Sequence, residues 1–386
     1  MASETAPSSR AATEREGFLG WVDGSLLALC AASVAIVVAS GLVQVSFGSF
    51  DMTLAQAWGA VFDPNVLLNP DAWQAFVFGG EVPEMNRRSL IVWNIRLPRV
   101  FVAVLVGMNL AISGAIFQAV TRNELASPFI LGVSSGAGLM ILVTLVLLAG
   151  TTIAVPFLFG GFVLTPSALL PVIASIGGIA AFVVVYAIAW KNGTSPVRLV
   201  LAGVIVGTIA QSFQTTLFFF ADDIGVVQSA IAWTTGSLTG TDWEQVRMAL
   251  PWTIFAVGAA LIGSRQLNVL LLGERTAKSL GMNVERMRFA LSGVAVLAAA
   301  ASIAVAGIVG FVGLVVPHVV RNVVGSDYRR LVVGCVFAGP ALMVAADVGA
   351  RLALSPVQIP VGIVTGLLGG PYFLYLMRRQ DEMGEI

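Results

Sequence analysis

The sequence predicts an all-α, polytopic membrane protein with about ten transmembrane helices per subunit and both termini in the cytoplasm. Hydrophobic residues make up 57% of the 386 residues and charged residues 11%, whereas soluble domains carry roughly a quarter charged residues. Long apolar runs recur along the whole chain, and basic residues gather in alternate loops. These three observations together predict the fold class.

The spans follow from apolar runs of roughly 17 to 25 residues, the length at which a helix crosses the bilayer core. Residues 1–24 are polar and lack the pattern of a signal peptide, so we predict a disordered cytoplasmic tail there. The transmembrane domain is predicted over 25–379, and 380–386 form a second cytoplasmic tail. The predicted spans are 25–47, 100–120, 129–150, 167–190, 198–220, 247–263, two within 289–325, 331–350 and 360–377.

The apolar stretch 289–325 is too long for a single span. Gly307, Gly310 and Gly313 interrupt its middle, and glycine clusters mark turns. We therefore predict two spans joined by a tight turn.

Charge asymmetry orients the spans, because cytoplasmic loops of membrane proteins carry an excess of Lys and Arg. With the N-terminus inside, 15 of the 21 basic residues lie on the cytoplasmic side. The other six lie outside: Arg87, Arg88, Arg96, Arg99, Arg247 and Arg351. This bias favours ten spans over nine.

Two long loops stand out. The outer loop 48–95 is acidic and carries Trp58 and Trp73, which indicates an external cap or interfacial helices. The cytoplasmic loop 264–286 contains Glu274, which can pair with Lys278 four residues on, and Gly281, which suits a helix end. A short docking helix and a plain solvated connector are both open there.

Several classes of function are excluded or disfavoured. The formal net charge of zero excludes a strongly basic nucleic-acid binder. No Gly-Lys dipeptide occurs, so there is no phosphate-binding P-loop, and a single histidine, His318, makes no histidine-pair metal site. Cys30 and Cys335 lie in apolar runs and are interpreted as small buried hydrophobes. We expect no catalytic residue, no metal and no cofactor.

Charged residues within spans are expensive and often functional. Asp347 is such a residue, and it is either a proton relay or a structural group bonded to a neighbour or to Arg351 one turn on. Arg96 and Arg99 bracket Pro98 at the outer start of a span and, taken alone, are interpreted as snorkelling interfacial residues.

From about residue 90 onward, a series of motifs agrees in order and spacing with one known family. The chain resembles the permease subunits of ATP-binding-cassette (ABC) importers for cobalamin, iron–siderophore complexes and haem. The motifs are Arg96-Leu97-Pro98-Arg99, Gly114, Gln118, Asn123, Leu125 to Pro128, Leu131-Gly132, Ser134 to Ala137, Leu201-Ala202-Gly203, Trp233, Gly236-Ser237-Leu238, Gly273 to Gly281, Gly310 to Leu314, Pro317-His318, Arg321 and Pro360-Val361-Gly362.

The resemblance implies a permease in the cell membrane, working as a homodimer or a pseudodimer with two ATPase subunits and an extracytoplasmic substrate-binding protein. It implies that Arg96, Arg99 and Arg351 meet the binding protein. It also implies that Asn123 and Leu125, and the turn Thr194-Ser195-Pro196, form two cytoplasmic gates. The coupling element that enters the ATPase would be Gly273, Glu274, Arg275, Thr276, Ala277, Lys278, Ser279, Leu280 and Gly281.

The chain departs from the family pattern in three places. Glu124 stands where a proline usually follows the asparagine, which predicts a more charged and less rigid first gate loop. Gln358 replaces a usual glutamate, and the outer segment 62–90 is longer than the family norm.

The leading hypothesis is therefore the permease subunit of an ATP-driven importer for a metal chelate, which itself hydrolyses no ATP. The alternative is a secondary transporter coupled to protons through Asp347. A membrane structural or receptor protein is a further, weaker alternative.

Overall fold

The structure is a computed structural model that describes residues 21–47, 50, 52–147, 153–155, 162–164, 166–191, 193–220, 224–354 and 357–384. Most of the predicted N-terminal tail, residues 1–20, lies outside these described residues. The described chain is helical apart from one short antiparallel hairpin of β1 (Ile153–Val155) and β2 (Phe162–Leu164). The predicted all-α class is thus confirmed.

A helix lies over each of the ten predicted apolar runs. Within the described residues, seven helical stretches are long and apolar enough to cross a membrane, and three shorter apolar helices accompany them: α7, α14 and the apolar part of α16. The helices are α1 (Gly24–Ser46), α6 (Leu97–Thr121), α7 (Val133–Leu147), α8 (Pro166–Ala189), α9 (Pro196–Phe218), α11 (Trp243–Leu271), α13 (Val284–Ala306), α14 (Val312–Val324), α15 (Tyr328–Leu352) and α16 (Val361–Gly384).

The predicted turn between residues 307 and 313 is present. Helix α13 ends at Gly307, whose φ is +70°, and α14 starts at Val312. A Cβ on Gly307 would lie 2.4 Å from the carbonyl oxygen of Trp233, so only glycine fits this contact.

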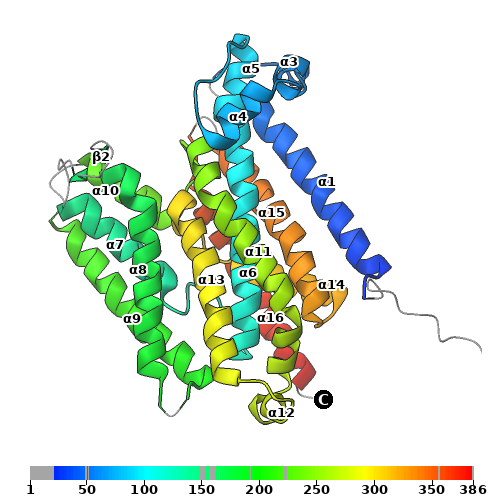
Figure 1. The fold of residues 1–386 in the computed structure, drawn as a ribbon, viewed down its shortest axis with the longest axis vertical. Coiled ribbons are helices and arrows are strands. Elements are labelled where there is room, and N and C mark those ends of the chain that lie inside the picture. Colours follow the sequence, from blue (N-terminus) through cyan, green and yellow to red (C-terminus); the bar gives the residue numbers. More distant parts are fainter. Residues whose placement is uncertain are drawn as a thin grey trace, which may run out of the picture.

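Helix α6 is the centre of the core, with α11, α13, α14 and α15 packed around it (Figure 1). Small residues allow this packing. A Cβ on Gly107 would lie 2.5 Å from the carbonyl oxygen of Gly339 in α15, and a Cβ on Gly114 would lie 1.7 Å from that of Gly313 in α14. Membrane helices gain dispersion energy from such close backbone approach, which explains the abundance of glycine.

Helices α7, α8, α9 and the short α10 (Ile224–Thr235) form a second group beside this core (Figure 1). The backbone of α10 and of the residues after it is tied to neighbouring turns. The amide of Ile308 donates to Trp233 at 2.8 Å, and the amide of Gly362 donates to Gly236 at 3.1 Å. Residues from separate motifs of the sequence thus meet at one junction.

The loop 48–95 forms a helical cap at one end of the bundle, and α12 (Glu274–Ser279) lies at the other end (Figure 1). The cap is held by stacked aromatic rings, with Phe76 against Trp93 at 5.5 Å and against Trp243 at 4.8 Å between ring centroids. Its elements are α2 (Leu54–Val61), α3 (Pro64–Leu67), α4 (Pro70–Phe78), α5 (Arg87–Ile91) and the π-helix η1 (Val92–Arg96).

Helices extend into two segments predicted to lie outside the spans. Helix α11 continues to Leu271 and α13 already starts at Val284, so both enter the loop predicted over 264–286. Helix α16 runs on past its apolar part to Gly384, into the predicted cytoplasmic tail 380–386. Hydropathy marks the membrane-sized part of a helix but not a polar extension beyond it.

Candidate functional site

Helix α12 is largely exposed, and Ala277 is its one buried residue. Gly273 precedes the helix with a φ of +100°, and Gly281 follows it with a φ of +80°. Ala277 is buried, whereas Arg275, Thr276, Lys278, Ser279 and Leu280 are exposed. The predicted short helix is therefore present, with most of its surface free to contact another macromolecule.

Glu274, the first residue of α12, has a different partner from the predicted one. Its Oε1 accepts a bond of 2.7 Å from Nη2 of Arg288, so the predicted pairing with Lys278 is wrong. A bond to a guanidinium favours the carboxylate, and this bond holds the pKa of Glu274 below its ordinary value of 4.5. The helix start is thus tied to α13.

Arg288 also binds the turn before α9, which contains one of the two predicted gates. Its Nη1 donates to the carbonyl oxygen of Thr194 at 2.7 Å and to Oγ1 of Thr194 at 2.9 Å. Glu285, one turn earlier in α13, accepts from the amide of Thr194 at 3.2 Å and from its hydroxyl at 2.8 Å. Ser195 caps α9 through its backbone alone, and Pro196 is the first helical residue.

Sequence reasoning missed both Glu285 and Arg288. A signal for them exists, because Glu285 and Arg288 lie three residues apart on one helix face just before an apolar run. The two side chains, 3.3 Å apart, form an ion pair. Nothing in the local sequence, however, points to the turn at Thr194.

The first predicted gate lies in the turn after α6. Oδ1 of Asn123 accepts from the amide of Leu125 at 2.9 Å, and the Leu125 side chain is exposed. Glu124 lies 3.2 Å from Nη1 of Arg321 and 3.5 Å from Nδ1 of His318, both on α14. The ion pair with Arg321 holds this loop against α14, so the prediction of lower rigidity is not supported.

At the opposite end of the bundle, Asp347 is fully buried and ion-paired. Its two carboxylate oxygens each accept a bond of 2.8 Å from Arg99, and Gln44 donates to Oδ2 as well. The prediction that Asp347 bonds to a neighbour is confirmed, but its partner is not Arg351. Arg351 instead donates to the carbonyl oxygen of Gln44 at 3.1 Å.

Arg96 and Arg99 are buried rather than snorkelling. Arg96 donates to the carbonyl oxygens of Val45 at 2.6 Å and Phe50 at 2.5 Å. Arg99 donates additionally to Oε1 of Gln358 at 2.9 Å. Of the three arginines predicted to meet a binding protein, Arg351 alone has a partly exposed side chain in this structure.

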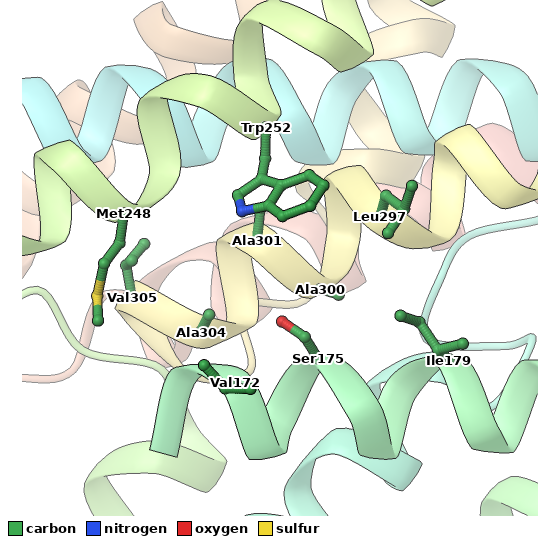
Figure 2. A pocket seen from close by; sticks show the side chains of 10 residues that line it. All are labelled: Val172, Ser175, Ile179, Met248, Trp252, Leu297, Ala300, Ala301, Ala304 and Val305. Carbon is green, nitrogen blue, oxygen red and sulfur yellow. The ribbon is translucent and has the colours of Figure 1, made fainter. Parts of the chain in front are cut away.

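A pocket between α8, α11 and α13 is shown in Figure 2. Its volume is about 260 Å³, and Trp252 and Met248 from α11 face alanines of α13 across it. None of its lining residues carries a titratable group. The pocket is mainly apolar, with the hydroxyl of Ser175 at its wall.

Within the described residues, no group of three or more His, Cys, Asp or Glu side chains could hold a metal ion. The polar groups of interest instead form two separate clusters at the two ends of the bundle. The cluster beside α12 contains Glu274, Glu285, Arg288 and Thr194, and that beside the cap contains Arg99, Asp347, Gln44 and Gln358.

Comparison with known proteins identifies relatives of this chain. The chain is 39% identical over 295 residues to the Fe(3+)-citrate import system permease protein YfmD of Bacillus subtilis, covering 76% of this chain and 83% of the relative. It is 41% identical over 302 residues to the cobalamin import system permease protein BtuC of Halobacterium salinarum, covering 78% and 76%. It is 38% identical over 293 residues to the hemin transport system permease protein HmuU of Yersinia pestis, covering 75% and 84%.

A solved structure described as an inward-facing metal-chelate type ABC transporter superposes with a TM-score of 0.73 at 24% identity, covering 92% of this chain and 99% of that chain. This likeness shows a shared fold. Residues 35–379 match the sequence profile of the FecCD transport family. Because the match covers most of the chain and several relatives exceed 30% identity, this chain belongs to the FecCD transport family.

Proposed function

We propose that this chain is the permease subunit of an ABC importer that carries a metal chelate into the cell. The observation that carries the proposal is α12, a short helix with an exposed face at one end of a membrane bundle whose sequence contains no P-loop. An importer that concentrates its substrate needs a source of free energy. An exposed helix held by Ala277 and by the pair of Glu274 with Arg288 suits contact with an ATPase subunit.

The proposal includes ten membrane-spanning helices and two cytoplasmic termini. Seven spans of full length and three shorter apolar helices support this number. The shorter α7 and α14 still contribute to the bundle, because both pack against neighbours through glycines. An even number of spans places both termini on one side, and the distribution of Lys and Arg assigns that side to the cytoplasm.

The proposed assembly contains two copies of this permease, two ATPase subunits and one extracytoplasmic binding protein. Residues 273–281 would contact the ATPase. Asn123, Leu125 and the turn 194–196 would close the passage on the cytoplasmic side. These roles derive from the resemblance, and the position of both turns near α12 supports them.

We also propose a role in docking for Arg96, Arg99 and Arg351. The role differs between the partly exposed Arg351 and the two buried arginines. Arg351 is placed to meet an acidic side chain of the binding protein. Arg96 and Arg99 are committed to groups within the chain, so we propose that they act by holding the helix ends that present Arg351. Exposed charge pairs of this kind mainly set orientation and encounter rate.

The substrate class is a bulky metal chelate. The similar permeases are named for ferric citrate, hemin and cobalamin, which share a metal ion held by an organic chelator. The alternative of proton coupling through Asp347 finds no support in the geometry. A proton carrier must exchange its proton with water, whereas Asp347 is 0% exposed and bonded to an arginine.

Reconstitution into liposomes tests the proposal. The purified chain is combined with its cognate ATPase and binding protein, and uptake of ferric citrate, a ferric hydroxamate, haemin and cobalamin is measured with ATP or with an imposed proton gradient. We expect that at least one chelate is taken up, and that this uptake requires ATP and does not depend on the proton gradient. Uptake driven by the gradient without the ATPase would overturn the proposal.

A further inference from the structure

The guanidinium of Arg288 joins two segments that are separate in sequence. One end of its fork binds Glu274 at the start of α12, and the other binds the backbone and hydroxyl of Thr194 in the turn before α9. The Arg288 side chain is 2% exposed, whereas that of Glu274 is 38% exposed. A buried cation therefore lies between an exposed helix and an internal turn.

In the part of the chain that the structure describes, this is the one charged contact that joins a side chain of α12 to another helix. Glu285 strengthens the far side of the link. It binds Thr194 through both the amide and the hydroxyl, and it pairs with Arg288 at 3.3 Å. Gly193 makes room for this arrangement, because a Cβ there would lie 3.1 Å from Oε1 of Glu285.

Burial makes it costly to separate the Arg288 cation from Glu274 and Thr194. A charge withdrawn from water is costly when its partners leave, and Nε of Arg288 already lacks a partner. Glu274 and Thr194 together supply most of the acceptors of this guanidinium. If α12 moves, Arg288 must either follow it and pull on the turn, or give up Glu274 and remain undercompensated.

We propose that Arg288 is a positioning residue that transmits displacement of α12 to the turn at Thr194, with Glu285 as its brace. The inference rests on the proposed function, in which α12 receives the motion of the ATPase and residues 194–196 close the passage. Arg288 then sets how tightly ATP hydrolysis and transport are linked, without touching either the nucleotide or the chelate.

The test is the coupling ratio, the number of chelate molecules taken up per ATP hydrolysed, in the reconstituted complex described above. Arg288→Gln removes the charge and one arm of the fork. We expect it to assemble with the ATPase and to hydrolyse ATP, while the coupling ratio falls about tenfold, within the usual range for coupling between two sites. A purely structural role would lower the amount of folded protein but not this ratio.

Arg288→Lys covers the case in which the glutamine variant fails to assemble. Lysine keeps the positive charge but has no planar fork with which to hold Glu274 and Thr194 together. We expect wild-type amounts of complex with a coupling ratio still below that of the wild type. A wild-type ratio in an assembled Arg288→Lys or Arg288→Gln complex would overturn the inference.

Arg330→Gln is the matched control. Arg330 also forms an ion pair near a cytoplasmic helix start, with Asp23 at 2.6 Å, but it contacts neither α12 nor the turn at Thr194. We expect its coupling ratio to be that of the wild type, and an equal fall in this control would also overturn the inference. Failure of the proposed function looks different, because the wild-type complex itself would then show no ATP-dependent uptake.

Discussion

The two ends of the bundle each contain a buried arginine, and the two arginines differ in what they join. Arg99 pairs with Asp347, and both lie on long core helices, α6 and α15. Arg288 pairs with Glu274 and Thr194, which lie on a six-residue helix and in a turn. One arginine fastens two parts of the rigid core together. The other joins a short, largely exposed helix to a turn.

Exposure of the acidic partner sharpens this difference. Asp347 is fully buried, so its ion pair has no water with which to exchange hydrogen bonds. Glu274 is partly exposed, so water can solvate its carboxylate when α12 shifts, at the cost of leaving the buried Arg288 undercompensated. The same type of charge pair thus acts as a fixed joint in one place and as a releasable link in the other.

The largest expected effect is on the fixed joint. Asp347→Ala leaves Arg99 buried without its carboxylate, and breaking a buried pair in this way costs about 3 to 5 kcal/mol. We expect a clear loss of folded protein and a lower thermal stability in detergent. Tryptophan fluorescence during heating measures the stability. The loss does not depend on ATP or on any partner protein.

The double variant Arg99→Met with Asp347→Leu is the control for this prediction. Removing both charges leaves no unpaired ion, and such replacements are often neutral or stabilising. We expect it to recover most of the stability that Asp347→Ala loses. A double variant as unstable as the single one would show that the pair does more than fasten α6 to α15.

A smaller effect on stability is expected at the releasable link. Glu274→Gln removes a pair whose acid is partly exposed, and the carboxylate of Glu285 still compensates the buried Arg288. The loss of thermal stability should therefore be smaller than that of Asp347→Ala, while the coupling ratio falls as in Arg288→Gln. A variant that loses stability as strongly as Asp347→Ala would contradict the contrast between the two ends.

The helices were predictable from the sequence because hydropathy and helix length are local properties. The turn at Gly307 was predictable for the same reason, since glycine clusters break helices wherever they occur. The partners of charged residues were not predictable. Local rules paired Glu274 with Lys278 and Asp347 with Arg351, each four residues on.

In the structure the actual partners lie well beyond one helical turn. Arg99 and Asp347 are 248 residues apart in sequence, Arg288 and Thr194 are 94 apart, and Glu274 and Arg288 are 14 apart. Pairs at a spacing of four contribute only about 0.2 to 0.5 kcal/mol, so a guanidinium brought close by helix packing displaces them, with two bonds in the case of Arg99 and Asp347. The burial of Arg96 and Arg99 could not be predicted from the local sequence either. It depends on how α1 and the cap fold over them.

The smallest expected effect is a pH dependence confined to the releasable link. Because the bond from Arg288 lowers the pKa of Glu274 in the folded protein, this bond stabilises α12 above the ordinary value of 4.5 and is lost as the pH falls through the lowered folded value. Between neutral pH and 4.5 the stabilisation should stay constant.

Hydrogen exchange of the α12 amides measures this stabilisation. Comparing the wild type with Glu274→Gln at each pH cancels the intrinsic pH dependence of exchange. We expect greater protection in the wild type at neutral pH and a difference that disappears only in acid below 4.5. A difference that already disappears near neutral pH would mean that a group other than Glu274 holds α12 in place.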